Sequence, residues 1–244
     1  MTSAARKVLA FAATAALAGG CGRRMLYEWR DEPYMRPVYA AGEAAARRRM
    51  GSRFADDRDI GCRVLSVIGR EAARSGDAAK AREIAGALIA HCEHETSAAV
   101  RSTILAVCLR NVGTGSERVH EYLRKEIAFG GESASAAYAL AALDGSCAFE
   151  SIAARYRASA DHGLKYELLG ALWLLGDARG VDILKAALAD MEGPLTSWPE
   201  RIHHMTRETC ATALRSRLDA LKKAAAAKTA DRRERGDSDG REAP

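Results

Sequence analysis

The chain has 244 residues, a mass of 26.2 kDa and a net charge of +5 at pH 7, the size of one domain with room for terminal segments. Aromatic residues make up only 6% while Ala, Leu and Arg are abundant, which disfavours a β-sandwich or barrel and favours helices. Five prolines and 21 glycines exclude a collagen-like chain, and no apolar run reaches the roughly 18 residues of a membrane span.

The first twenty residues have the pattern of a signal peptide. Arg6 and Lys7 precede the apolar stretch Val8–Ala18, which has the length of a signal-peptide core. The run that follows, Leu17-Ala18-Gly19-Gly20-Cys21, resembles the lipobox of bacterial lipoproteins, with Ala18 where the best examples have leucine. The resemblance implies that Cys21 is the lipid attachment site, on a cell membrane or outer membrane and facing the periplasm or exterior. The alternatives are an ordinary exported or N-terminally anchored protein and a cytosolic protein.

The first mature section, residues 21–57, is expected to be a lipid-anchored linker and N-terminal extension. It is rich in Arg, Tyr and Trp, so we expect part of it to cover the first helix pair as an extended segment, with a short helix over 40–50. Removal of residues 1–20 takes the basic count from 37 to 35 against 32 acids, a net charge of +3. Nucleic-acid binding normally needs a more basic face, so no nucleic-acid partner is expected.

From about residue 58 the sequence predicts short amphipathic helices, and strand alternation is not seen. Short breaks separate the helices, each with a glycine suited to a helix end and an Asp or Ser suited to the next N-cap. Gly76, Gly113, Gly145 and Gly176 are 37, 32 and 31 residues apart, a period typical of stacked helix hairpins. Apolar residues recur at helical spacing in Ile84/Leu88/Cys92, Val100/Ile104/Cys108, Phe149/Ile152/Ala153/Tyr156, Leu164/Leu168/Leu172/Leu175 and Val181/Leu184/Leu188/Met191.

The best-defined hairpin is residues 167–188, ELLGALWLLGDARGVDILKAAL. It resembles a HEAT repeat of the short kind found in phycobilin-lyase-like HEAT proteins, and the likeness extends over roughly 58–192. It implies an all-α fold: an α-solenoid of about four HEAT-like helical hairpins in a right-handed superhelix. The implied function is a protein–protein interaction scaffold for an envelope protein or peptide, anchored to the membrane by its lipid. The alternatives are a tetrapyrrole-type lyase or ligand chaperone, and a purely structural envelope component.

A capping helix is expected to complete the solenoid, which would then span 58–221. The run Ser197-Trp198-Pro199-Glu200 resembles a capping box with proline in the first turn, so it predicts a long helix directly after it. Residues 222–244 are highly charged without an apolar face, and a helix end running into a disordered tail is expected there.

No catalytic or phosphate-binding motif is present, so we assign no catalytic residue and no cofactor and do not expect an enzyme. Two clusters contain metal-ligand residue types, but zinc needs three or four converging ligands, so each is interpreted as a polar helix end or face. For a third set, packing between neighbouring repeats is the favoured interpretation, and the border of a concave surface is the alternative. The three sets are His91-Cys92-Glu93-His94, His203-His204 with Met205 and Cys210, and Glu167 with Lys165 and Trp173.

The remaining cysteines are Cys62, Cys92, Cys108, Cys147 and Cys210. Export would allow disulfides, but the number is odd, and Cys92, Cys108 and Cys210 fall where small core residues are expected. Buried free thiols are therefore the favoured interpretation, with a Cys92–Cys108 disulfide between stacked helices as the alternative.

Overall fold

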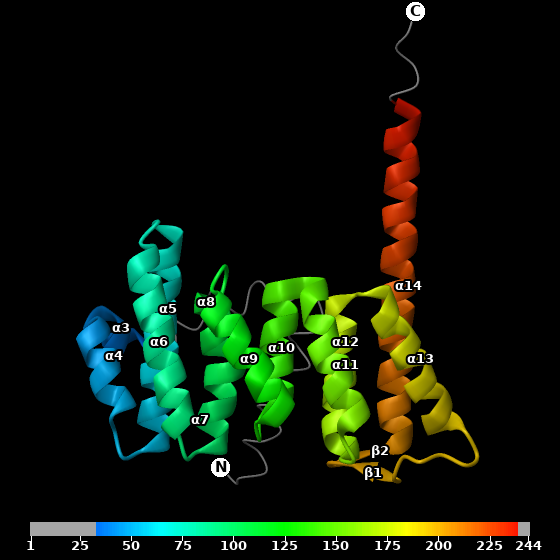
Figure 1. The fold of residues 1–244 in the computed structure, drawn as a ribbon, viewed down its shortest axis with the longest axis horizontal. Coiled ribbons are helices and arrows are strands. Elements are labelled where there is room, and N and C mark those ends of the chain that lie inside the picture. Colours follow the sequence, from blue (N-terminus) through cyan, green and yellow to red (C-terminus); the bar gives the residue numbers. More distant parts are fainter. Residues whose placement is uncertain (1–32, 239–244) are drawn as a thin grey trace, which may run out of the picture.

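The computed structural model describes residues 33–238, and nearly all of them are helical (Figure 1). The predicted signal peptide and Cys21 lie outside the described residues. Within them, no helix is both long and apolar enough to cross a membrane. The elements are α3 (Arg36–Ala40), α4 (Glu43–Met50), α5 (Ala55–Arg74), α6 (Ala78–His94), α7 (Ala98–Thr103), a π-helical segment η2 (Ile104–Leu109), α8 (Arg110–Val112), α9 (Glu117–Phe129), α10 (Ser133–Asp144), a 3-10 segment η3 (Gly145–Ala148), α11 (Phe149–Ala158), α12 (His162–Leu175), α13 (Ala178–Glu192), β1 (Arg201–Ile202), β2 (Met205–Thr206) and α14 (Arg207–Ser238).

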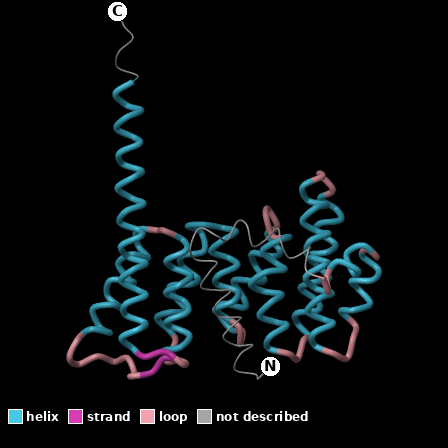
Figure 2. Tube along the Cα trace, turned by 180° about the vertical axis from the view of Figure 1, so that it is seen from behind, coloured by secondary structure: helices cyan, strands magenta, loops and turns pink. Residues whose placement is uncertain are grey.

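The helices lie beside one another, from α3 and α4 at one end of the body to α13 and α14 at the other (Figure 1). Helix α5, the continuous α7–η2–α8 rod, α10, α12 and α14 contact one another in turn, and we call them the first-helix layer. Helices α6, α9, α11 and α13 each pack beside a first helix and form the second-helix layer. The connections gather along two opposite edges (Figure 2). The all-α prediction is confirmed. The exception in the described residues is one hairpin of two strands, each two residues long.

The breaks between helices fall where the sequence places them. Gly76 and Gly176 have φ of 88° and 62°, in the left-handed region that glycine adopts without a steric penalty. Asp77 and Asp177 follow as N-caps, and their carboxylates accept from the Lys80 N–H at 2.9 Å and the Arg179 N–H at 2.8 Å. Each cap satisfies a backbone donor that the helix itself leaves unpaired.

Replacing Asp177 by alanine is expected to lower the free energy of unfolding by about 1 kcal/mol, because the first turn of α13 loses its side-chain acceptor. Asp182→Ala is the matched control, since its carboxylate lies in the same helix, is 81% exposed and meets only Lys185 at 3.6 Å. Urea unfolding measures both variants. Equal midpoints for the two would show that the cap contributes nothing.

One hydrophobic core runs the length of the body, from Met35 to Leu218. The predicted stripes supply it, and Ile84, Ile104 and Leu168 are fully buried. Within the α7–η2–α8 rod, the sequence did not predict the π-helical segment η2. Five of its six side chains are buried. The wider π-helical turn therefore lets this segment pack apolar side chains against both α5 and α10.

The N-terminal extension covers α5 as helices α3 and α4, where the sequence suggested an extended segment with one helix. Met35 and Ala46 are buried, and the Tyr39 hydroxyl donates to the Glu71 carboxylate on α5 at 2.5 Å. Gly61 lets α4 approach closely, because a Cβ there would lie 2.7 Å from the Ala46 carbonyl oxygen.

The prediction of a helix directly after the 197–200 run is wrong, because a short β-hairpin lies between that run and α14. Ser197 donates its hydroxyl to Asp190 at 2.7 Å instead of capping a helix. Trp198 is buried, and β1 and β2 form an antiparallel hairpin before α14 begins at Arg207. The Arg207 N–H donates to the Glu200 carbonyl at 2.8 Å and closes the hairpin onto the helix.

Helix α14 extends well past residue 221, where the sequence analysis placed the end of the capping helix. It runs to Ser238, so most of the segment expected to be a disordered tail is helical. Ala, Lys and Arg have high helix propensity, and this accounts for a helix without an apolar face. On its packed part, α14 contacts α12 and α13 and so covers the end of both layers.

Candidate functional site

Polar side chains join consecutive helices of the first-helix layer. The Arg63 guanidinium on α5 donates to the Thr103 hydroxyl on α7 at 3.3 Å. Ser102 on α7 and Ser135 on α10 share a hydrogen bond of 2.7 Å. These pairs are half-buried and link neighbouring helices in register. We call the side of the first-helix layer that carries these pairs the first-helix face.

An aromatic and arginine cluster lies on this face where α10, α12 and α14 meet. The Arg217 guanidinium on α14 lies 5.7 Å from the ring centres of both Tyr166 and Trp173 on α12. The Trp173 indole N–H donates to the Arg217 carbonyl at 3.1 Å. A Cβ at Gly170 would overlap the hydroxyl of Tyr138 on α10, so glycine is what allows Tyr138 to lie across α12.

The ionisable groups of this cluster are perturbed by burial. Burial raises the pKa of Tyr138 to about 12, with the Arg217 charge opposing the shift. Burial also raises the pKa of Glu167, and the nearby Glu132 and Asp161 carboxylates act in the same direction. Clusters of partly desolvated ionisable groups are common where proteins bind other molecules.

Glu167 connects this cluster to the hairpin. Its Oε1 lies 3.5 Å from His203 Nε2, and the His203 charge opposes the rise in the pKa of Glu167. His203 has φ of 55°, a strained conformation for a residue with a Cβ. A Cβ at Gly163 would lie 2.5 Å from the His203 ring. A shallow hollow of about 320 Å³ opens beside it, lined by residues 160–163 together with Pro199, Arg201, Ile202 and His203.

The structure brings together only part of the predicted concave set. Glu167 and Trp173 both belong to the first-helix face, and Trp173 packs against α14 as the favoured packing interpretation expected. Lys165 does not join them, because its Nζ lies 5.7 Å from the ring centre of Tyr156 on α11. Side chains two positions apart do not face the same side of a helix, so Lys165 points away from the side on which Glu167 meets His203.

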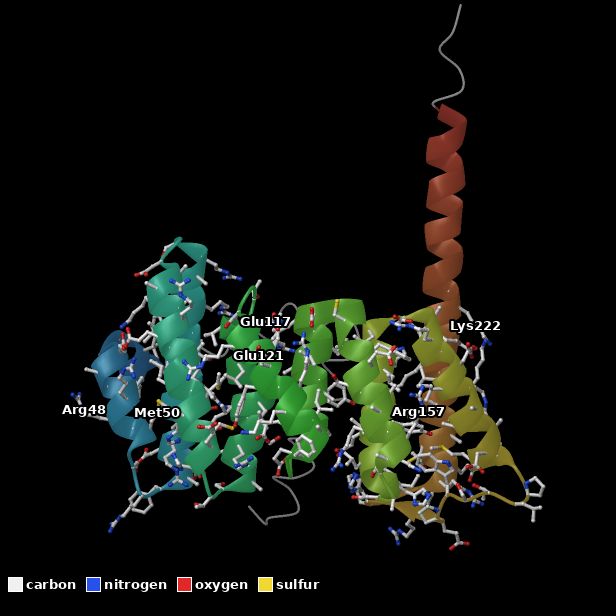
Figure 3. The ribbon with its side chains drawn as sticks, in the orientation of Figure 1. Arg48, Met50, Glu117, Glu121, Arg157 and Lys222 are labelled. Carbon is white, nitrogen blue, oxygen red and sulfur yellow. The ribbon has the colours of Figure 1, made fainter. Side chains whose placement is uncertain are left out.

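The His91–His94 cluster lies at the end of α6 beside a second open hollow, of about 380 Å³, lined by Arg47, Met50, Gly51, Ala87, Ala90, His91 and His94. Met50 points in from α4 toward α6 while Arg48 points away (Figure 3). Cys92 is buried in the core. Among residues 33–238, no three His, Cys, Asp or Glu side chains are placed to hold one metal ion, and His203 pairs with a carboxylate.

The strongest charged cluster lies next to this hollow. Glu95 is 1% exposed and accepts from the Arg58 guanidinium through both oxygens, each at 2.7 Å. It also accepts from the Ser97 N–H at 2.7 Å, and His91 Nε2 lies 3.2 Å away. The Arg58 hydrogen bonds, the Ser97 N–H and the charges of Arg58 and His91 lower the pKa of Glu95 to about 2. This cluster fixes the turn between α6 and α7.

The five cysteines of the described part are free thiols. Cys62, Cys92, Cys108 and Cys210 are buried, and the sequence had placed all of these except Cys62 at core positions. The alternative of a Cys92–Cys108 disulfide is wrong, because both are free thiols. Burial raises the pKa of Cys108 to about 12. Cys147 is exposed.

In the native protein, maleimide is expected to modify Cys147 and leave Cys62, Cys92, Cys108 and Cys210 unmodified, because the reactive thiolate needs access and a low pKa. Peptide mass mapping before and after guanidinium unfolding measures this. Labelling of Cys108 as fast as that of Cys147 in the native state would contradict the packing of α5 against η2.

Comparison with known proteins does not place the chain in a family. No family model, no curated protein and no solved structure matches it.

The sequence analysis missed Tyr138, Arg217 and the strain at His203. Tyr138 and Arg217 belong to helices far apart in the chain, so spacing within one helix does not bring them together. A usable signal did exist for Tyr138, because Ser135, Tyr138 and Ala142 are spaced along one side of a helix made mostly of Ala and Leu.

Proposed function

We propose that the protein is a lipid-anchored scaffold for protein–protein interaction in the cell envelope, carried by Cys21. In this proposal the four pairs α5/α6, α7–α8/α9, α10/α11 and α12/α13 form a HEAT-like α-solenoid with a right-handed superhelix, and α14 is its capping helix. The anchor is supported by the 17–21 run, and the solenoid by helices that alternate in chain order between the first-helix layer and the second-helix layer.

The observation that carries the proposal is the first-helix face. Within residues 133–142 of α10, only Ser135, Tyr138 and Ala142 are not buried, so the helix presents one narrow stripe there. Stacked helices that each present a stripe form the long binding surface typical of helical repeat proteins. Next to this stripe lie Trp173 and Arg217, and Trp, Tyr and Arg are the residue types that dominate binding energy at protein interfaces.

The chemistry of the face favours a peptide segment as the bound element. Tyr138 and Trp173 offer apolar contact area, and the partly exposed Arg217 side chain offers guanidinium donors. Glu167 and His203 offer a carboxyl and an imidazole at the hairpin end. A lipid on Cys21 would confine the search to the membrane surface and raise the effective concentration of a co-anchored partner.

Photo-crosslinking tests this proposal in the full chain expressed in a bacterial envelope. A photoreactive amino acid is placed at Ala142, on the first-helix face, or at Glu121, which projects from α9 in the second-helix layer (Figure 3). We expect a discrete adduct from position 142 that is lost with Arg217→Glu, and none from position 121. Equal adduct patterns from the two positions, or an adduct indifferent to Arg217→Glu, would contradict a binding role for this face.

A further inference from the structure

The connections of the body divide into two edges of different character. The loops at 51–54, 95–97, 130–132, 159–161 and 193–200 lie along the edge that is lower in Figure 1, and we call it the loop edge. The opposite edge holds the turns at 75–77, 113–116 and 176–177 and the η3 segment between α10 and α11. The three turns consist of Gly, Ser, Thr and Asp, and η3 is Gly-Ser-Cys-Ala.

The three most exposed large apolar side chains of the described part all belong to the loop edge. Leu195 is 96% exposed, Phe129 87% and Phe54 57%. Phe54 precedes α5, Phe129 ends α9, and Leu195 lies between α13 and β1, so they are spread along the edge. Scattered apolar residues are ordinary on protein surfaces. Here, however, three large apolar side chains lie at the loop edge and small residues form the opposite edge, so the two edges differ chemically.

The chain length outside the described residues keeps this body close to any membrane that holds Cys21. Eleven residues, 22–32, separate Cys21 from the first described residue, and a fully extended chain of that length spans roughly 36–40 Å. Helix α5, with 20 residues, is itself about 30 Å long. An anchored body therefore stays within roughly 40 Å of the bilayer surface, so one of its edges or faces can rest on that surface.

We propose that the loop edge rests on the bilayer that holds the Cys21 lipid, with Phe54, Phe129 and Leu195 inserted at the boundary between headgroups and acyl chains. This inference rests on the proposed anchor. Apolar side chains at that depth add to membrane binding in proportion to the area they bury. The same loops carry charges of both signs, because Arg53 lies 4.7 Å from the Phe54 ring centre and Glu132, Asp161 and Glu200 occupy other loops. We therefore expect the contact to form on zwitterionic lipid without a requirement for anionic lipid. The first-helix face then stands upright and open to a partner at the membrane surface.

Fluorescence quenching in liposomes tests the orientation with the full chain. Cys147→Ser removes the exposed thiol of the described residues, and in the unlipidated arm Cys21→Ala removes the remaining thiol of the leader. A single labelling site is then introduced by Phe129→Cys or Leu195→Cys on the loop edge, or by Thr114→Cys in an opposite turn as the matched control. Each is labelled with a polarity-sensitive dye and reconstituted into phosphatidylcholine liposomes that contain a lipid-borne quencher. We expect strong quenching and a blue-shifted emission at 129 and 195, neither at 114, and unchanged Tm for all three.

The outcomes separate the inference from the anchor. Liposome-bound protein whose dyes at 129 and 195 stay as unquenched as the dye at 114 would overturn the orientation and leave the anchor intact. Unlipidated protein whose dyes at 129 and 195 are nevertheless quenched on added liposomes would support the loop edge and remove the anchor. Protein that neither carries lipid nor meets liposomes would overturn both.

Discussion

Arg58→Ala is expected to lower the Tm by roughly 5–10 °C, because it leaves the Glu95 carboxylate buried without its main partner. Glu95 is 1% exposed, and both of its oxygens accept from Arg58. Arg58 also donates to the carbonyls of Ser52 and Arg53, each at 3.1 Å, so the same guanidinium holds the chain between α4 and α5. Thermal unfolding followed by circular dichroism measures the change.

The effect has a defined dependence on pH. The pKa of Glu95 is lowered from 4.5 to about 2 in the folded state, so the carboxylate contributes stability that is fully present above about pH 4.5. This contribution is lost as the pH falls toward about 2. The difference in Tm between wild type and Arg58→Ala should therefore shrink across that window. A difference that stays constant from pH 7 to pH 2.5 would contradict the assignment.

Two further variants separate the effect of an unpaired buried charge from the effect of losing a cation. Arg58→Met combined with Glu95→Leu should recover much of the lost stability, since removing both partners leaves no unpaired buried charge. Lys185→Ala is the matched control for losing a cation, because Lys185 meets only the 81% exposed Asp182 at 3.6 Å, and exposed pairs contribute little. A Tm loss for Lys185→Ala equal to that for Arg58→Ala would show that net charge, and not this cluster, sets the effect.

Gly61→Ala is expected to destabilise the protein by about 1–3 kcal/mol, because overpacking a tight contact forces backbone to move. A Cβ at Gly61 would lie 2.7 Å from both the Ala46 carbonyl oxygen and the Met50 nitrogen of α4. Backbone atoms cannot rotate aside as a side chain can, so α4 must shift away from α5. Chemical unfolding measures the loss, and faster tryptic cleavage within α4 reports the detachment.

Gly86→Ala is the control for the substitution itself. Gly86 also lies inside a helix, but its added Cβ would meet only the end of the flexible Arg118 side chain at 3.0 Å. Alanine has the higher helix propensity, by about 1 kcal/mol, so this variant should be neutral or more stable. Parallel behaviour of the two glycine variants would mean that α4 does not pack on α5 as described.

The helix boundaries were largely predictable because they depend on local chemistry. Gly76 and Gly176 adopt left-handed φ, and Asp77 and Asp177 cap the helices that follow, all within a few residues. The hairpin after α13 was not predictable in this way. Ser197 has the spacing of a capping residue, yet Asp190 seven residues earlier takes its hydroxyl, and the burial of Trp198 depends on packing across the fold.

The candidate site was predictable only in pieces. Glu167 and Trp173 belong to one helix and could be singled out from its pattern, whereas Tyr138 and Arg217 join them only after α10, α12 and α14 pack together. His203 shows the same limit, because its partner Glu167 lies on α12. Contacts between distant elements leave no periodic trace in the sequence, so composition and spacing do not reveal them.

The intact mass of the protein from a bacterial membrane fraction tests the central claim most directly, because the scaffold and its orientation both depend on the anchor. The full chain and Cys21→Ala are expressed side by side and separated by detergent partitioning. We expect the wild-type protein to begin at Cys21, to carry a diacylglycerol-sized mass increment and to enter the detergent phase, and the variant to do none of these. An unmodified chain that begins at Met1 and stays in the aqueous phase would contradict the account.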